Sequence, residues 1–299
     1  MGAIQEQNLS RQLLGNAAQL FLFSTDPERF SEQIAATQTA LSGIVHAFIK
    51  LGKEDQILKS VGPLLLSSLR PSLPPDSEID KYLATILVCE PKKKPQTLTE
   101  LITSFDNIII LLGKKASGKG TVSQILNEDY GFPNMPTSDW LRAIAAARGY
   151  PESFNPTMLR KLGDKLRQEF GGEVLVWLTL QEYALKDHKN VVFDGLRSET
   201  EMAQLISSPN VTFIWVDAPD EKRLERAQKR ARPEDPQTIQ KLLGVNAKTF
   251  PEAERLKRLC RYSIDNPGDD ILALKEKTNT LMVQLSINKP NIPTLGRIK

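Results

Sequence analysis

The sequence has few cysteines and no long apolar run. Cys89 and Cys260 are the two cysteines among 299 residues, which excludes a disulfide framework and a four-cysteine zinc site. The longest mostly apolar stretches, 17–23 and 108–112, are far shorter than the roughly 18 residues that a membrane span needs. A protein without a membrane partner is therefore expected. Since no secretory leader is recognisable either, the sequence predicts a cytoplasmic location.

An excess of one charge sign is also missing. The 39 basic and 36 acidic residues leave a net charge of +3, which gives no general electrostatic case for nucleic-acid binding. Hydrophobic residues make up 40% of the chain and charged residues 25%, as in ordinary globular proteins. The length is sufficient for about two domains. Any anion chemistry must therefore come from local clusters of basic residues.

Residues 1–90 have the pattern of a small all-α domain. Apolar residues recur at helical spacing between Leu13 and Phe21 and again between Phe30 and Ile49, and two further helical segments cover 57–69 and 77–89. Residues 91–104 begin with two prolines and three lysines, which is typical of a linker. The pattern leaves the role of this domain open, and a homodimer contact or a protein partner is the expectation.

From residue 105 the pattern changes to strands that alternate with helices. The runs 108–112, 191–193 and 211–216 are rich in apolar, β-branched residues, as expected of strands buried in a parallel sheet. Helical patterns cover 120–127, 139–148, 156–170, 173–187, 199–206 and 220–230. This alternation predicts an α/β domain over 105–285, with a doubly wound parallel sheet and helices on both faces. Residues 286–299 lack periodicity and are expected to form a tail.

The strongest local signal is a glycine-rich segment that follows the first predicted strand. Residues 113–119 match the pattern G-x-x-x-x-G-K, and a helical segment comes next. Glycines are needed there because successive backbone N–H groups must turn inward around phosphate oxygens, at the positive end of the helix. An ordinary strand-to-helix turn is the alternative interpretation. The predicted nucleotide contacts are Gly113, Ala116, Ser117, Gly118, Lys119, Gly120 and Thr121.

The ending G-K-G-T resembles the phosphate loop of adenylate kinases and the related nucleoside monophosphate kinases. Thr137 and Arg142 belong to T-S-D-W-L-R, which is similar to the T-G-D-x-L-R segment of that family. The resemblance implies that both residues contact the nucleotide that accepts the phosphate. An everyday helix start with an exposed arginine is the alternative for this segment.

Two later segments extend the resemblance, which covers roughly residues 107–285. D-G-L-R at 194–197 is similar to D-G-F-P-R of adenylate kinases, with one residue fewer, and resembles more closely the D-G-x-R-S of archaeal proteins related to dephospho-CoA kinase. It implies that Asp194 organises magnesium through water and that Arg197 holds the acceptor. E-R-A-Q-K-R at 225–230 resembles the start of the lid, which implies that Arg226 and Arg230 neutralise the transferring phosphoryl group. A surface turn and a solvated helix face are the respective alternatives.

One departure from the family pattern concerns a second arginine pair after the lid. Relatives often carry R-D-x-R-E there, whereas this chain offers Arg255, Lys257 or Arg258 as substitutes. The resemblance implies transfer of a phosphoryl group from ATP, with Mg²⁺, to a nucleoside monophosphate, with Lys119 and Asp194 in the catalytic set. Two alternatives stay open: dephospho-CoA or another small phosphorylated acceptor, and an ATP-binding regulatory protein with little turnover.

Overall fold

The computed structural model describes most of the chain outside residues 51–96. The described ranges are 2–23, 28–50, 97–134, 136–148, 150, 156–185, 187–231, 236–250 and 252–289. The predicted helices over 57–69 and 77–89, the first part of the predicted linker and the end of the tail lie outside these ranges. The chain divides into two compact units, which we describe separately. The helical unit holds Met1–Ser104 with Pro136–His188, and the sheet unit holds Phe105–Met135 with Lys189–Lys299.

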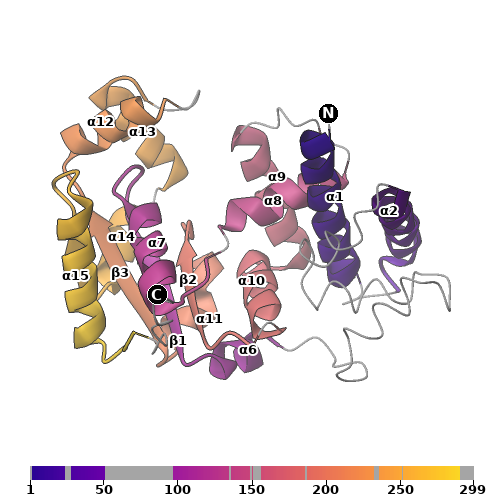
Figure 1. The fold of residues 1–299 in the computed structure, drawn as a ribbon, viewed down its shortest axis with the longest axis horizontal. Helices are drawn as coiled ribbons and strands as arrows, with labels where there is room; N and C mark the ends of the chain where they lie inside the picture. The colour runs from indigo at the N-terminus through magenta and orange to yellow at the C-terminus, as the bar shows by residue number, and fades with distance from the viewer. Residues whose placement is uncertain are drawn as a thin grey trace, which may run out of the picture. The chain divides into compact units, whose positions relative to one another are not determined.

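The sheet unit is built on four parallel strands within its described residues. The strands are β1 (Asn107–Leu112), β2 (Asn190–Asp194), β3 (Val211–Asp217) and β4 (Tyr262–Asp265). Their order in the sheet is β2-β1-β3-β4, so the first strand lies in the interior (Figure 1). The register pairs Leu111 of β1 with Asp194 of β2 and Leu112 of β1 with Trp215 of β3. The carboxyl ends of these strands therefore meet at one edge, where open α/β sheets bind ligands.

Helices of the sheet unit cover its strands. They are α7 (Lys119–Tyr130), the short η2 (Thr200–Met202), α11 (Ala203–Ile206), α12 (Asp220–Arg230), α13 (Ile239–Thr249), α14 (Ala253–Leu259) and α15 (Ile271–Gln284). α7 and α15 pack side by side against the sheet (Figure 1). Their inward faces join Ile109, Leu111 and Ile264 of the sheet in one buried cluster. Because β1 is apolar at every residue after Asn107, it is buried on both faces and anchors this core.

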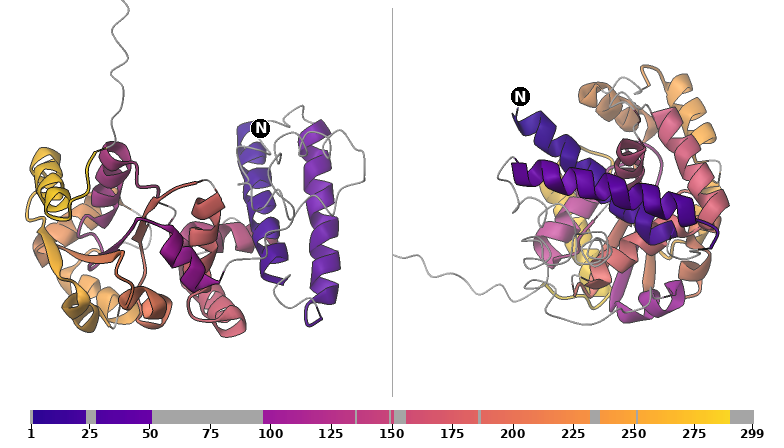
Figure 2. Two further views of the ribbon diagram at one scale, coloured as in Figure 1. Left: turned by 90° about the horizontal axis from the view of Figure 1, so that it is seen from below. Right: turned by 90° about the vertical axis from the view of Figure 1, so that its right-hand side faces the viewer.

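The helical unit combines N-terminal helices with a segment from the middle of the chain. Its described helices are α1 (Gly2–Phe23), α2 (Ser31–Lys50), α6 (Leu98–Ser104), α8 (Thr137–Ala147), α9 (Pro156–Phe170) and α10 (Val174–Leu185). α1 and α2 run beside each other, as Figure 2 shows, and α1 also packs along α8. At the crossing, a Cβ on Gly15 would overlap the backbone carbonyl of Ala143. Glycine is therefore required for the two helix backbones to approach this closely.

The predicted α/β class with N-terminal helices before a parallel sheet is confirmed. The predicted strands and the helices that separate them are present with ends shifted by a few residues, and α13, α14 and α15 are additional helices. The predicted domain limits at 90, 105 and 285 stay a prediction, since the compact units divide the chain by contacts rather than by sequence order. Among the described residues, no helix is long and apolar enough to cross a membrane.

Candidate functional site

The phosphate loop connects β1 to α7 through three residues with positive φ. They are Gly113 (φ +149°), Ala116 (φ +63°) and Gly118 (φ +105°), and the helix begins directly afterwards at Lys119. An alanine with a left-handed backbone conformation is uncommon. Such strained backbone clusters at functional sites, where the surrounding structure holds it in place. The side-chain hydroxyl of Ser117 is buried in this loop without a hydrogen-bond partner. A buried donor of this kind is suited to a phosphate oxygen.

The loop fits so closely against its surroundings that two of its glycines cannot carry a side chain. A Cβ on Gly113 would overlap the backbone carbonyl of Val216 in β3. A Cβ on Gly118 would overlap the side-chain amide of Asn266, which follows β4. That amide donates a hydrogen bond of 2.9 Å to the carbonyl of Ser117. β3 and the turn after β4 therefore fix the loop from outside, because both approach its backbone at glycine positions.

Lys119, the first residue of α7, extends its side chain back to the start of the loop. Its ammonium group donates to the backbone carbonyls of Gly113 at 3.0 Å and Lys114 at 3.2 Å. Burial lowers the pKa of Lys119 below its ordinary value, while the carboxylate of Asp194 opposes this shift. Three arginines act in the same direction as burial: Arg197, Arg223 and Arg230. The lysine therefore stands in a strongly positive region, in which an arriving phosphate would favour its charged form.

Asp194 ends β2 and lies beside the start of α7. Its Oδ2 would be 3.8 Å from a Cβ placed on Gly120. Burial raises the pKa of the Asp194 carboxyl, whereas Lys119 and Arg197 oppose that shift. A half-buried acid next to a half-buried lysine, each with a shifted pKa, at the ligand edge of a sheet is a combination of the kind found at functional sites. The structure thus brings the predicted pair, Lys119 and Asp194, together.

Arg197 is held by a turn that follows β2. The backbone N–H groups of Arg197 and Ser198 donate to Oε2 of the buried Glu201, at 2.7 and 3.1 Å. The side chain of Arg197 is exposed and lies within electrostatic reach of both Lys119 and Asp194. Glu201 was not predicted. Its only sequence signal is S-x-x-E, a helix-capping pattern that begins at Ser198.

The three arginines of α12 have different surroundings. Arg223 is fully buried, pairs with Asp220 and donates to the backbone carbonyl of Lys115 in the phosphate loop at 3.3 Å. The Arg226 guanidinium donates hydrogen bonds to groups of the protein. Its acceptors are the carbonyls of Ser117, Asn266 and Gly268, the Asn266 side chain and the Asp269 carboxylate. Arg230 lines a cavity beside the loop. The predicted catalytic roles of Arg226 and Arg230 stay predictions.

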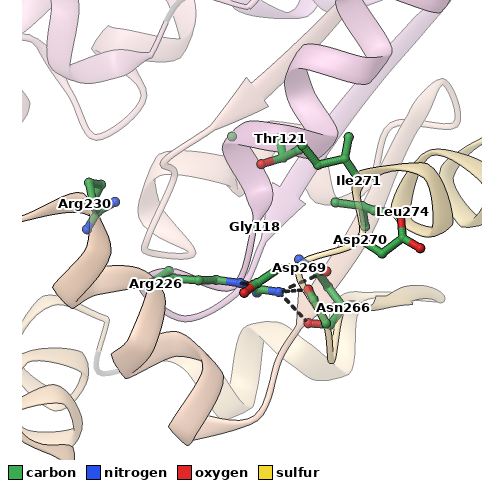
Figure 3. Close-up of a pocket in the computed structure, with 12 residues that line it drawn as sticks. Gly118, Thr121, Arg226, Arg230, Asn266, Asp269, Asp270, Ile271 and Leu274 are labelled. Carbon is green, nitrogen blue, oxygen red and sulfur yellow. Dashed lines mark hydrogen bonds and ion pairs between the residues drawn. The ribbon is translucent and has the colours of Figure 1, made fainter.

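A cavity of about 340 Å³ opens beside the phosphate loop (Figure 3). Gly118, Gly120 and Thr121 form its loop side, and Ile271 and Leu274 of α15 supply apolar surface. Its remaining lining residues are Ala116, Arg226, Arg230, Asn266, Gly268, Asp269 and Asp270. In Figure 3 the Arg226 side chain extends toward Asn266 and Asp269. An apolar wall next to a phosphate loop, with a few polar groups, is suited to a ring joined to phosphates.

α14 contributes ion pairs to the ends of the first three strands. Glu254 pairs with Lys114 of the phosphate loop at 3.1 Å, and Lys257 pairs with Asp217 at the end of β3 at 3.0 Å. Arg255 pairs with Glu199, which follows β2. Arg255 and Lys257, proposed as substitutes for the missing arginine pair, therefore lie at this edge and are engaged by carboxylates.

The predicted acceptor residues of α8 belong to the helical unit. Thr137 is the first residue of α8 and is buried, while Arg142 lies about one turn further along and is half exposed. The Arg142 guanidinium donates to the Ser138 hydroxyl and to the Asp139 carboxylate, each at 2.9 Å. Both partners belong to its own helix, so they fix the guanidinium at the amino end of α8. Acceptor binding by Thr137 and Arg142 stays a prediction.

The donor set at the loop fits Mg²⁺ held mainly by phosphates and water. Among the described residues, no group of three or more His, Cys, Asp or Glu side chains is placed to hold a metal ion. Oxygen groups beside the phosphate loop include the Asp194 carboxylate and the Thr121 hydroxyl. Mg²⁺ keeps several waters and commonly takes one or two carboxylates together with substrate phosphates. The predicted role of Asp194 through water is compatible with this set.

Comparisons with known proteins place the phosphate loop within a matched family region. Residues 109–244 match a family described as AAA domain, which implies nucleotide binding. A UPF0200 protein of Pyrococcus abyssi is 33% identical over 146 residues, which cover 47% of this chain and 76% of that protein. A UPF0200 protein of Hyperthermus butylicus is 34% identical over 131 residues, covering 44% and 69%.

Among solved structures, shikimate kinase from Bacteroides thetaiotaomicron is similar over 60% of this chain and 98% of that protein, with a TM-score of 0.40 and 11% identity. A likeness this remote carries no argument about substrate or reaction.

Proposed function

Since this chain belongs to the UPF0200 protein family, whose name states no reaction, we propose its function from the site. The P-loop domain transfers a phosphoryl group from ATP to a nucleoside monophosphate or a similar small phosphorylated acceptor. The observation that carries the proposal is a phosphate loop whose buried Ser117 hydroxyl lacks a partner and whose Lys119 lies within electrostatic reach of the Asp194 carboxylate. This arrangement supports the binding of a polyphosphate that is then attacked at its end.

Each group would have a limited task, because phosphoryl transfer depends on positioning and charge neutralisation more than on covalent chemistry. The loop N–H groups and Lys119 would hold the β- and γ-phosphates, and Arg197 would hold the acceptor phosphate near Asp194. Mg²⁺ supplies charge neutralisation on the phosphates when bound. Arg226 and Arg230, at the cavity, would neutralise the transferring group, which requires Arg226 to exchange protein acceptors for phosphate oxygens.

The test is acceptor-dependent release of ADP from ATP with Mg²⁺. The acceptors are the nucleoside monophosphates and dephospho-CoA, and the variants are Lys119→Ala and Arg142→Ala, with exposed Arg160→Ala on α9 as control. Turnover with one acceptor class is expected, lost in Lys119→Ala and weakened in Arg142→Ala through a raised KM for the acceptor. Equal turnover in wild type and Lys119→Ala would overturn the proposal.

A second candidate is a nucleotide-binding regulatory protein with little turnover. It is favoured by one observation, which is that Arg226, Arg255 and Lys257 are all engaged by protein carboxylates or carbonyls. No arginine pair of the family type follows the lid segment to take over their role. ATP binding that requires Lys119, without ADP release for any acceptor, would select this candidate.

A further inference from the structure

The most buried arginine of the sheet unit lies next to the phosphate loop. Arg223 has no exposed surface, although it stands on α12, whose other basic residues are at least partly exposed. Its NH2 group pairs with Asp220 and its NH1 group donates to the carbonyl of Lys115 at 3.3 Å. Its Nε has no hydrogen-bond partner. Burying an arginine is costly unless its charge is used, so this placement needs an explanation.

We infer that Arg223 is a positioning residue for the phosphate loop, which fixes the loop backbone at Lys115 and adds positive charge beneath the phosphates. The Lys115 carbonyl belongs to the stretch in which Ala116 and Gly118 take positive φ. When that carbonyl is held outward by the guanidinium, the N–H groups that follow are left free to turn toward an anion. Arg223 therefore acts on the ligand through the loop, and it does not need to touch the phosphates.

The chain path supports this role, because α12 follows directly from β3. The carbonyl of Val216, near the end of β3, abuts Gly113 at the start of the loop. The backbone N–H of Arg223 donates to Pro219 at 2.9 Å, which fixes the first turn of the helix behind that contact. β3 and α12 thus brace the loop at two points, through a backbone contact at Gly113 and through the guanidinium at Lys115.

The second part of the role is electrostatic. The charge of Arg223 lies within reach of Lys119 and lowers its pKa, as do the charges of Arg197 and Arg230, while Asp194 opposes them. A cation that is also desolvated acts more strongly on its neighbours than an exposed one. Arg223 therefore adds to the positive potential that the loop presents to an anion, and its removal weakens that attraction.

The experiment measures the dissociation constant of a non-hydrolysable ATP analogue by calorimetry, together with the melting temperature of each variant. It compares wild type with Arg223→Met, Arg223→Lys and Asp220→Asn, and uses Lys241→Met, an exposed cation on α13, as the matched control. Arg223→Met is expected to weaken binding about tenfold, as for a lost hydrogen bond to a charged group. Arg223→Lys keeps the charge and one donor, so it regains part of this affinity. Asp220→Asn, which releases the guanidinium, gives a smaller loss of affinity.

A purely structural arginine would lower the melting temperature without weakening binding to the folded protein, and this result would overturn the inference. If Arg223→Met does not fold, Arg223→Lys and Asp220→Asn decide, and wild-type affinity in both would overturn it as well. The inference rests on the proposed function only in taking a nucleoside triphosphate as ligand. Binding that is absent in wild type overturns both proposals, whereas binding that is lost in Lys119→Ala and unchanged in Arg223→Met overturns this one alone.

Discussion

Alanine at Gly118 should damage the phosphate loop by a calculable amount. The residue has φ +105°, which costs a side chain about 1–3 kcal/mol. The new Cβ would also displace the amide of Asn266, which breaks its hydrogen bond to the Ser117 carbonyl at a cost of about 1 kcal/mol. The two effects together amount to about 2–4 kcal/mol. If the loop relaxes to escape the strain, this sum becomes a loss of roughly 30- to 1,000-fold in ATP affinity.

The assay combines urea unfolding with calorimetric titration of the ATP analogue, because strain that is not lost as affinity appears as lost stability. Gly131→Ala is the matched control, since Gly131 has φ +70° at the end of α7 and nothing lies within 4 Å of the added Cβ. It should lower stability by about 1 kcal/mol and leave ATP affinity unchanged. The reasoning is refuted if Gly118→Ala loses no more stability plus affinity than Gly131→Ala.

Three further predictions concern positions away from the loop. Thr179→Val should lower the free energy of unfolding by about 1–3 kcal/mol in urea titrations, because it leaves the buried indole N–H of Trp140 without its 3.0 Å partner. Asp129→Asn should cost about 0.5–1 kcal/mol at pH 7. Hydrogen bonds from two lysines lower the pKa of the Asp129 carboxyl. The stability that they contribute is therefore complete above the ordinary pKa of an aspartate and is lost as the pH falls through the lowered pKa. Urea unfolding curves of wild type and variant should accordingly converge in acid. Burial raises the pKa of the Cys260 thiol to about 12, so in a Cys89→Ser background it should resist a thiol reagent at pH 8 until urea unfolds the chain, and rapid labelling of the folded protein would contradict this.

The parts of the fold with local signals were predictable from the sequence. β1, the phosphate loop and α7 follow one another in the chain, and the buried run, the glycine spacing and the helical pattern are all readable within residues 107–130. The ends of β2 and β3 were predictable for the same reason. α15 was not predicted, although Asp270 caps it by accepting from the N–H groups of Leu272 and Ala273. Its exposed apolar residues, such as Ile271 and Leu272, obscure an amphipathic pattern.

The arginines of α12 show why the site could be predicted only in part. Arg223, Arg226 and Arg230 share one helix face, and a run of charge on a helix usually indicates a solvated surface. Helical spacing identifies the common face but does not say which position turns under the loop. The difference arises because β3 places the start of α12 against the phosphate loop, which buries Arg223, while Arg230 lines the cavity. The hydrogen-bond partners of these arginines in the loop lie about 100 residues away in the sequence, so local spacing does not identify them.

The close packing of α1 on α8 has a consequence for how the chain is made. α1 ends at Phe23, whereas the helix that covers it begins at Thr137, so the ribosome must add more than 100 residues before the contact can form. At about 5–20 residues per second, the newly made α1 waits several seconds or longer with part of its apolar surface uncovered. During that interval α2 is its nearest partner in the described chain. Slowing synthesis between these two helices should therefore increase the fraction of nascent chains that chaperones capture, and a chain released before Thr137 would lack the α8 surface that α1 packs along.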